Sequence, residues 1–424
     1  MKRKGQTQSQ AAGAVNKDPG ARLVCLDAFR GFDILVMVFV NYIAPMAAIP
    51  FILRHAKVEM DAYTITDVVF PGFLFVVGVA IPLSLGKRTG AGIPLGRVLG
   101  RIFIRTAGLL FLGLIEVNRE QFSAADTGMS RALWYLLAFL AVIALWNIYP
   151  KTEDRKRRSL HLGLRVGGAL VLLVLVILFR GRTEAGSVVW IQPSWWGILG
   201  LIGWAYLICS LVYLAFGRSR AALMGILGLF IAFNAGNHLG ALNFMNSLMT
   251  KKTGAMMSCH AAIVLAGVMV GTLFTPAARK TTPKERSLFM LLFGVGLYAA
   301  GLLLRPLQGI SKIRATESYA LVTAGVCCLL FLGFYLLMDV LKMRRWSGFL
   351  QPVGKNPLLA YILPDIVVCV LLLISGLIRF DVGRLLWPFA ERGGVPGMLN
   401  ALVFTGFILL LTALATRARI ILRL

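Results

Sequence analysis

Seven of the polar or ionisable side chains between residues 27 and 67 are ones that a membrane span would normally exclude. They are Asp27, Arg30, Asp33, Asn41, His55, Asp61 and Asp67. Charged groups inside the hydrocarbon of a bilayer cost several kcal/mol unless they are partnered, so each of these side chains is a candidate for function. No other part of the sequence concentrates such residues so densely.

The chemistry that this stretch best supports is general-base catalysis by His55. An imidazole has an unperturbed pKa of about 6.5, which suits proton transfer at neutral pH. Asn41 ends one apolar run and Asp67 begins the next, and Pro45 and Pro50 interrupt the helical pattern between them. The sequence therefore predicts that His55, Asn41 and Asp67 meet at one membrane edge.

Four more polar residues fall at the same edge and are candidates for the same pocket: Glu116, Asn118, His238 and His260. The histidines come from separate apolar runs and have no HxxxH or carboxylate spacing, so we predict no metal site. The six cysteines lie in or beside apolar runs without a CxxC pair, which predicts neither a disulfide framework nor a zinc site.

A second group of candidates belongs to the opposite edge. Asp27, Arg30 and Asp33 share roughly one helix face, either as an interfacial ion pair with a snorkelling arginine or as a charged wall along an entrance. The segment GKNPLLAY predicts a helix start with Asn356 as its cap, beside Lys355. A helix start is also the backbone arrangement that binds phosphates.

The elements that position these residues are membrane-spanning helices. The chain has 424 residues, of which 58% are hydrophobic and 15% are charged, whereas a soluble chain has about a quarter charged residues. We predict an all-α polytopic integral membrane protein with twelve spans, at roughly 23–48, 64–86, 98–117, 131–149, 163–180, 195–216, 219–235, 258–276, 287–304, 317–341, 357–376 and 398–416. Asp365 follows a proline inside one of these spans, as either a structural or a catalytic carboxylate.

The basic residues set the expected orientation. The net charge of +26 is spread over short clusters between the spans, which favours contacts with lipid headgroups or phosphates and no nucleic-acid partner. Alternate loops and the termini carry 29 of the 44 Lys and Arg residues, so we predict both termini in the cytoplasm. We predict a disordered cytoplasmic tail at 1–21 and a single transmembrane domain at 22–424, in which 130–180 is an extra helix hairpin.

Eight segments of the chain occur in this order: LDAFRGFDILVMVFVNY, RHA, TDVVFPGFLFVVGVAIPLSL, GRIFIRTAGLLFLGLIEVN, WWGILGLIGWAYL, HAAIVLAGVMVG, SYALVTAG and GKNPLLAYIL. In sequence and order they resemble a known family, the transmembrane acetyltransferases related to heparan-alpha-glucosaminide N-acetyltransferase. The resemblance places the family's functional histidine at His55, its asparagine at Asn41 and its aspartate at Asp67. An apolar residue near Leu201 stands where the family has arginine, and the large lumenal domain of the animal enzymes is absent.

The resemblance implies transfer of an acetyl group from cytoplasmic acetyl-CoA to the amino group of a glucosamine-type acceptor, in a bacterial inner membrane. His55 would act as base or carry the acetyl group, Asn41 would donate to the oxyanion, and Asp67 would orient the imidazole. The residues assigned to the acetyl-CoA site are Asp27, Arg30, Arg101, Arg105, Lys355 and Asn356. A secondary transporter of a small anionic or sugar solute and a polysaccharide O-acyltransferase are the alternatives, and a homodimer is left open.

Overall fold

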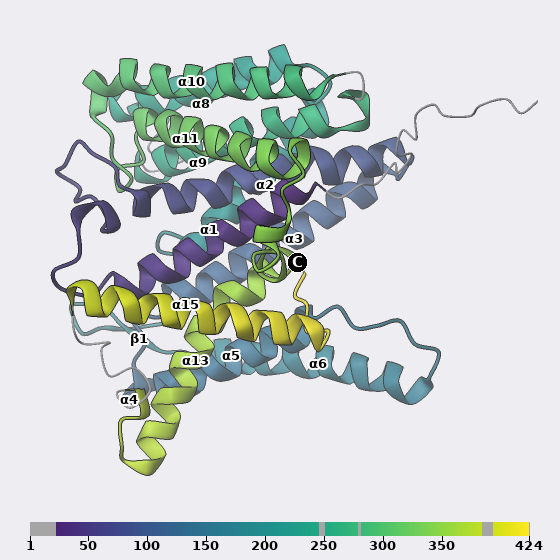
Figure 1. Cartoon of the computed structure of the whole chain (residues 1–424). Coiled ribbons are helices and arrows are strands. Elements are labelled where there is room, and N and C mark those ends of the chain that lie inside the picture. Colours follow the sequence, from purple (N-terminus) through teal and green to yellow (C-terminus); the bar gives the residue numbers. More distant parts are fainter. Residues whose placement is uncertain (1–22, 246–250, 279–280, 384–392, 424) are drawn as a thin grey trace, which may run out of the picture.

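A computed structural model describes residues 23–245, 251–278, 281–383 and 393–423. The longest helices that the structure describes extend across much of the molecule from left to right (Figure 1). The described helices are α1 (Val24–Ile43), α2 (Ile65–Gly90), α3 (Leu95–Val117), α4 (Ala124–Thr127), α5 (Arg131–Trp146), α6 (Arg155–Leu178), α7 (Gly197–Phe216), α8 (Arg220–His238), α9 (Lys251–Gly271), α10 (Pro283–Gln308), α11 (Glu317–Tyr335), α12 (Gln351–Lys355), α13 (Pro357–Ile378) and α15 (Gly394–Arg417).

Short elements complete the described part of the chain. Strands β1 (Gly181–Arg182) and β2 (Val188–Val189) form an antiparallel pair. The 3₁₀ turns are η1 (Phe51–Leu53), η2 (Asn243–Met245), η3 (Thr272–Phe274), η4 (Pro276–Ala278) and η6 (Arg345–Ser347), and η5 (Leu336–Val340) is a π-helical turn that continues α11.

The predicted all-α membrane fold is confirmed. Ten of the described helices are long and apolar enough to cross a membrane. The two remaining predicted spans correspond to α1, which has 20 residues but carries three charged side chains, and to α5, which has 16 residues. The predicted tail at 1–21 lies outside the described residues.

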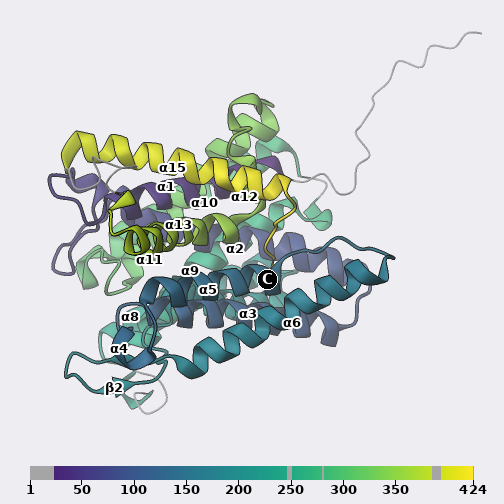
Figure 2. The ribbon, with the colours of Figure 1, turned by 90° about the horizontal axis from the view of Figure 1, so that it is seen from below.

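The helices differ greatly in how deeply they are buried. In the apolar part of Thr253–Phe274, a segment that includes most of α9, 89% of the residues are buried. In the apolar part of α6, only 17% are buried. Helices α8 to α11 form the upper part of Figure 1, with α1 and α2 across the middle and α5, α6, α13 and α15 below. Seen from below, α6 lies along one edge and α15 along the other (Figure 2). The predicted hairpin at 130–180 corresponds to the packed pair α5 and α6.

Glycines bring the backbones of α2 and α9 into contact. A Cβ on Gly78 would lie 2.0 Å from the Val264 carbonyl oxygen, and a Cβ on Gly267 would lie 2.1 Å from the Phe75 carbonyl oxygen. Gly267 and Gly271 form a GxxxG pattern, which permits close packing of membrane helices. This contact fixes α2, whose first turn carries Asp67, against the most buried helix.

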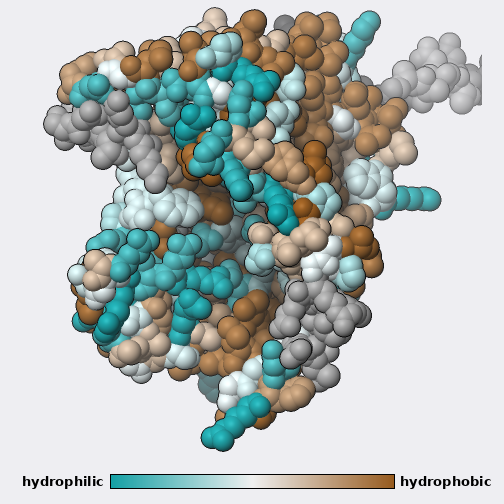
Figure 3. Space-filling view, turned by 90° about the vertical axis from the view of Figure 1, so that its left-hand side faces the viewer, coloured by the Kyte–Doolittle hydropathy of each residue, from teal (hydrophilic) through white to brown (hydrophobic). Residues whose placement is uncertain are grey.

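The bundle has two ends of different character. We call the end with the start of α1, the turn 91–94 and the segment 147–154 the basic end, and the opposite end with the segments 44–64 and 309–316 the His55 end. The basic end is on the right of Figure 1, and the His55 end is on the left. Figure 3 views the left-hand end, where hydrophilic side chains surround a hollow near the middle. That the basic end faces the cytoplasm is still a prediction.

Candidate functional site

Asp67 is held in place by the first turn of α2. Thr64 is the N-cap of this helix, and its hydroxyl accepts a hydrogen bond from the Asp67 N–H at 3.3 Å. In return, Asp67 Oδ2 accepts the Thr64 N–H at 3.2 Å, which completes a capping box. A carboxylate here is also favoured by the positive end of the helix dipole. The Asp67 side chain is 1% exposed, so its second oxygen needs a protein partner.

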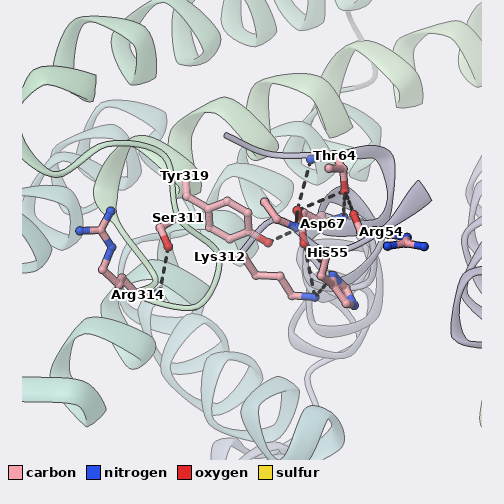
Figure 4. Close-up of polar contacts among 9 residues, drawn as sticks. Arg54, His55, Thr64, Asp67, Ser311, Lys312, Arg314 and Tyr319 are labelled. Carbon is pink, nitrogen blue, oxygen red and sulfur yellow. Dashed lines mark hydrogen bonds and ion pairs between the residues drawn. The ribbon is translucent and has the colours of Figure 1, made fainter. Parts of the chain in front are cut away.

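That partner is His55, in the segment that leads into α2 (Figure 4). The distance between His55 Nδ1 and Asp67 Oδ1 is 2.7 Å. The flanking backbone is bound to the same turn, because the Ala56 N–H donates to Asp67 Oδ2 at 3.1 Å and the Thr64 hydroxyl donates to the Arg54 carbonyl at 2.6 Å. A carboxylate that accepts from Nδ1–H fixes the tautomer and leaves Nε2 as the basic nitrogen. The His55 side chain is 45% exposed, so a reactant can approach it.

A lysine that the sequence analysis did not select completes the cluster. Lys312 Nζ lies 3.2 Å from His55 Nδ1 and 3.9 Å from Asp67 Oδ1. Burial lowers the pKa of Lys312 below its ordinary value, and the negative charge of Asp67 opposes this shift. Lys312 thus places a positive charge beside Asp67, on the Nδ1 side of the imidazole.

The loop that carries Lys312 connects α10 to α11 and is fixed at several points. Asp61 Oδ1 accepts the Ile310 N–H at 2.6 Å, and Asp61 Oδ2 accepts from Arg305 Nε at 2.8 Å. The Tyr319 hydroxyl, on α11, donates to the Asp67 carbonyl oxygen at 2.7 Å. The loop therefore presents Lys312 in a defined position.

Asn41 does not join this cluster by a direct contact. It lies near the C-terminal end of α1 and is exposed. Among the described residues no hydrogen bond connects it with His55 or Asp67. The structure thus brings together two of the three predicted catalytic residues and leaves the third at the same end of the bundle.

Glu116 and Asn118 lie at the end of α3 with other partners. Glu116 accepts a hydrogen bond from Tyr361 on α13. The Asn118 side chain donates to the carbonyl oxygens of Leu114 and Gln192, each at 2.8 Å, and accepts the Gln192 N–H at 3.0 Å. Asn118 is thereby occupied as a connection between α3 and the segment before α7, while Glu116 borders a small cavity of about 20 Å³ beside Asp365.

His238 and His260 lie toward the His55 end, and Glu317 lies near His238. His260 is 4% exposed, and its ring packs edge-on against Phe70 of α2 at 5.0 Å between centroids. His238 ends α8 and lies within electrostatic reach of the fully buried Glu317 at the start of α11. Within the described chain His238 Nε2, His260 Nδ1 and both Glu317 oxygens are buried without a hydrogen-bond partner.

At the basic end, three of the residues predicted for a cofactor make structural contacts, and a fourth is exposed. Arg30 pairs with Asp27 at 3.6 Å and donates to the Gly354 carbonyl at 3.3 Å, which connects α1 to α12. Asn356 occupies the predicted cap position, but its side chain makes no capping bond. Instead, it binds the segment after α15, donating to the Ile420 carbonyl at 2.7 Å and accepting the Leu422 N–H at 3.1 Å. Lys355 is exposed.

Arg101 and Arg105 belong to a cluster of four arginines. Arg88, at the end of α2, lies within electrostatic reach of both and of Arg423. The Arg105 guanidinium lies over the Tyr206 ring, 4.7 Å from its centroid. None of the four forms an ion pair with a carboxylate in the described part of the chain. Four like charges without a counter-ion favour an anionic ligand.

This protein is similar to known proteins over part of its length. The family model "Domain of unknown function (DUF5009)" matches residues 22–257, more than half of the chain. The chain belongs to the DUF5009 family. Two relatives of known activity match a shorter part of this DUF5009 protein. It is 36% identical over 97 residues to the heparan-alpha-glucosaminide N-acetyltransferase of Mus musculus and 37% identical over 97 residues to that of Homo sapiens. Each match covers 23% of this chain and 14% of the relative.

The DUF5009 match covers only part of the site. It contains His55, Asp67 and the arginines of α2 and α3, but Lys312, Glu317 and Arg423 lie beyond residue 257. The signal that could have identified Lys312 is its place in the short segment SKIRATES, where a cation precedes an apolar span on the side poor in basic residues. Among the described residues no group of three or more His, Cys, Asp or Glu side chains is arranged to hold a metal ion.

Proposed function

We propose that this DUF5009 protein is a membrane acetyltransferase, which moves an acetyl group from acetyl-CoA at the basic end to the amino group of a glucosamine-type sugar at the His55 end. The observation that carries the proposal is the contact of 2.7 Å between His55 Nδ1 and the buried carboxylate of Asp67. It leaves Nε2 basic and accessible, as a general base or an attacking nitrogen requires. The relatives named above, which are N-acetyltransferases, support the same assignment.

In the direct route, the sugar nitrogen attacks the thioester carbonyl carbon while His55 Nε2 takes a proton from that nitrogen. The C–S bond then breaks, and the CoA thiolate leaves with the proton that the imidazole returns. Asp67 stabilises the imidazolium that forms in between. Lys312 offsets part of the charge of Asp67, whose position is fixed by the N–H groups of Ala56 and Thr64.

In the covalent route, His55 Nε2 itself attacks the thioester and releases the thiolate, and the acetyl-imidazole then transfers its acetyl group to the amine. Both routes develop negative charge on the carbonyl oxygen. Asn41 is the proposed donor to that oxygen, because its exposed amide has no hydrogen bond to the cluster. Only the covalent route predicts that labelled acetyl-CoA, added without an acceptor, transfers its label to His55.

The cofactor is proposed to dock its phosphates on Arg88, Arg101, Arg105 and Arg423. Among the described residues these guanidiniums have no carboxylate partner, and they lie at the opposite end of α2 from Asp67. From residue 67 to residue 88 an α-helix rises about 31 Å, so the acyl arm of the cofactor would extend along α2 toward His55.

The decisive experiment is His55→Ala, with acetyl transfer from labelled acetyl-CoA to glucosamine as the readout. Loss of a general base costs about 10²–10⁴-fold in rate, while CoA binding at the far end should be unchanged. His161→Ala is the matched control, since His161 stacks on Tyr149 near the basic end, with 4.8 Å between ring centroids. Transfer at the wild-type rate by His55→Ala would remove this histidine from the mechanism.

One observation favours a second function, a proton-coupled transporter. Arg119 is paired with Asp365, and Tyr361 with Glu116, where α3 and α13 face each other in the membrane domain. Ionisable groups inside a membrane are typical of proton relays. Uptake of labelled glucosamine into proteoliposomes without acetyl-CoA, reduced by Glu116→Gln and not by His55→Ala, would support transport over acetyl transfer.

A further inference from the structure

The amino group of Lys312 lies directly beside the imidazole of His55. Its Nζ is 3.2 Å from His55 Nδ1 and 3.9 Å from Asp67 Oδ1. The side chain extends from the segment 309–316 to the imidazole (Figure 4), and 27% of it is exposed. A reactant that reaches the His55 ring is therefore also within reach of this amine.

Asp67 does not depend on this lysine for its hydrogen bonds. Its carboxylate already binds His55 Nδ1 at 2.7 Å, the Ala56 N–H at 3.1 Å and the Thr64 N–H at 3.2 Å. The contact of 3.9 Å with Lys312 is longer than a hydrogen bond, for which donor and acceptor are about 2.7–3.2 Å apart. An ion pair with Asp67 therefore does not by itself account for the position of the amine.

The ring nitrogen nearest to Lys312 is not free to accept a hydrogen bond from it. A ring nitrogen carries either a proton or a lone pair, and the proton on His55 Nδ1 is donated to Asp67. Among the described residues, no other acceptor lies within hydrogen-bond distance of Lys312 Nζ. A charged ammonium thus lies beside a donor, whereas a neutral amine keeps a lone pair that is available. Burial favours the same neutral form, since it lowers the pKa of Lys312 against the opposing charge of Asp67.

A neutral lysine amine on its flexible four-carbon stem is a nucleophile. Nδ1 and Nε2 of His55 belong to one small ring, so rotation of the lysine side chain brings Nζ toward a carbonyl carbon that is held beside Nε2. An amine is also the group that the proposed reaction acetylates. The same chemistry therefore applies to Lys312 and to an acceptor sugar, and Lys312 is already in place.

We propose that Lys312 is a self-acetylation site, whose Nζ takes the acetyl group when acetyl-CoA is bound and no acceptor is present. The lone pair of Nζ attacks the thioester carbonyl carbon, the C–N bond forms, and the C–S bond breaks with its electron pair going to sulfur. Nζ loses one proton to His55, which passes it to the CoA thiolate. The products are an acetamide on Lys312 and the free CoA thiol. This inference rests on the proposed delivery of acetyl-CoA to His55.

Acetylation of Lys312 should block the site. Acetylation removes the charge of a lysine, so the positive charge beside Asp67 is lost. The added acetyl group also has to fit next to a ring nitrogen from which Nζ is only 3.2 Å away. Because an amide is far less reactive than a thioester, the block is lasting, and an acceptor prevents it by taking the acetyl group first.

The test incubates the full chain in lipid nanodiscs with isotope-labelled acetyl-CoA and measures the label on each lysine by mass spectrometry. Lys57 is the matched control for uncatalysed acetylation, since it is exposed and lies two residues after His55. Lys312 should be labelled at least about 100-fold faster in wild type than in His55→Ala, the lower bound for loss of a general base. Lys57 should be labelled equally in both proteins. Methyl glucosaminide added with the acetyl-CoA should suppress the label on Lys312 alone.

Lys312→Arg supplies a second measurement. Arginine keeps the positive charge, but its guanidinium stays protonated and is not a nucleophile. Incubation with acetyl-CoA before the acceptor is added should reduce transfer by wild type, relative to the same protein without this incubation, and should not reduce transfer by Lys312→Arg. An equal loss in the two proteins would contradict a block at Lys312.

The outcomes separate this inference from the proposed function. An unlabelled Lys312 would overturn the inference, and acetylation of the sugar in the same sample would leave the proposed function intact. Equal labelling of Lys312 and Lys57, or labelling of Lys312 that persists in His55→Ala, would also overturn the inference. Labelling of Lys312 that requires His55, without acetylation of any amino sugar, would support the inference and refute the sugar as acceptor.

Discussion

Replacing Asp67 with asparagine tests how the buried carboxylate controls His55. Oδ2 accepts N–H groups from Ala56 and Thr64 at 3.1 and 3.2 Å, and only the amide oxygen of asparagine can take over these bonds. The amide NH₂ must then face His55 Nδ1 in place of Oδ1. Nδ1 has to become an acceptor, so the imidazole proton moves to Nε2 and the base is lost.

The magnitude follows from the surroundings of Asp67. Its side chain is 1% exposed, so no bulk water replaces the lost acceptor. A hydrogen bond to a charged group contributes about 1.5–3 kcal/mol, which corresponds to roughly 10–100-fold in rate. Loss of the correct tautomer adds a share of the 10²–10⁴-fold that general-base catalysis supplies. We therefore expect acetyl transfer by Asp67→Asn to fall at least about 100-fold.

The assay is single-turnover transfer from labelled acetyl-CoA to a glucosaminide, with melting temperature measured on the same samples. Because the capping bonds to α2 are kept, the melting temperature of Asp67→Asn should stay within a few degrees of wild type. Asp154→Asn is the matched control, since Asp154 caps α6 at the opposite end. A normal transfer rate with an intact fold would refute the orienting role of Asp67.

Three further predictions concern the orientation, the cofactor and the loop at the His55 end. Cysteine at Ser187 should react with an impermeant maleimide added outside, whereas cysteine at Lys156 should not; the reverse pattern would place the basic end outside. Arg101→Gln should weaken CoA binding several-fold and reduce its salt dependence, measured by calorimetry; unchanged affinity would exclude this arginine from the site. The Ile310 N–H lowers the pKa of Asp61 below 3.8, so the stability that this carboxylate contributes is present above pH 3.8 and lost as the pH falls through the lowered value. Asp61→Asn should accordingly lower the melting temperature near neutral pH and not in strong acid, and an equal effect at both would contradict the electrostatic account.

The fold was predictable because the membrane imposes a simple rule on sequence. Every backbone group in the bilayer must be bonded within a helix, so apolar runs report the spans directly. The start of α10 is also evident from the sequence, because Thr282 and Glu285 form a capping box and Pro283 occupies the first helical position. Even α1 was recognisable, although Asp27 and its neighbours lower its hydropathy.

The contacts of the candidate site were predictable only where the residues are close in sequence. His55 and Asp67 are twelve positions apart and belong to one loop and one helix start. Lys312 reaches them from 257 positions away, and no periodicity or spacing encodes such a contact. Arg88 and Arg423 were not predicted as part of the arginine cluster for the same reason. Asn356 was recognised as a helix start, but its side chain serves Ile420 and Leu422, which a local pattern does not specify.

The glycine contact between α2 and α9 has a consequence for assembly in the membrane. When α2 leaves the translocation machinery, the helix that will cover Gly78 has not yet been made, because Gly267 is far along the chain. During this interval the surface of α2 at Gly78 is not yet covered by α9, and Asp67 can form contacts only with residues of the loop between α1 and α2. A side chain at Gly78 would leave insertion of α2 unaffected and block its docking onto α9. Such a variant should accumulate as a fully inserted chain in which His55 and Lys312 do not come into contact. We expect membrane proteases to degrade this incompletely packed chain.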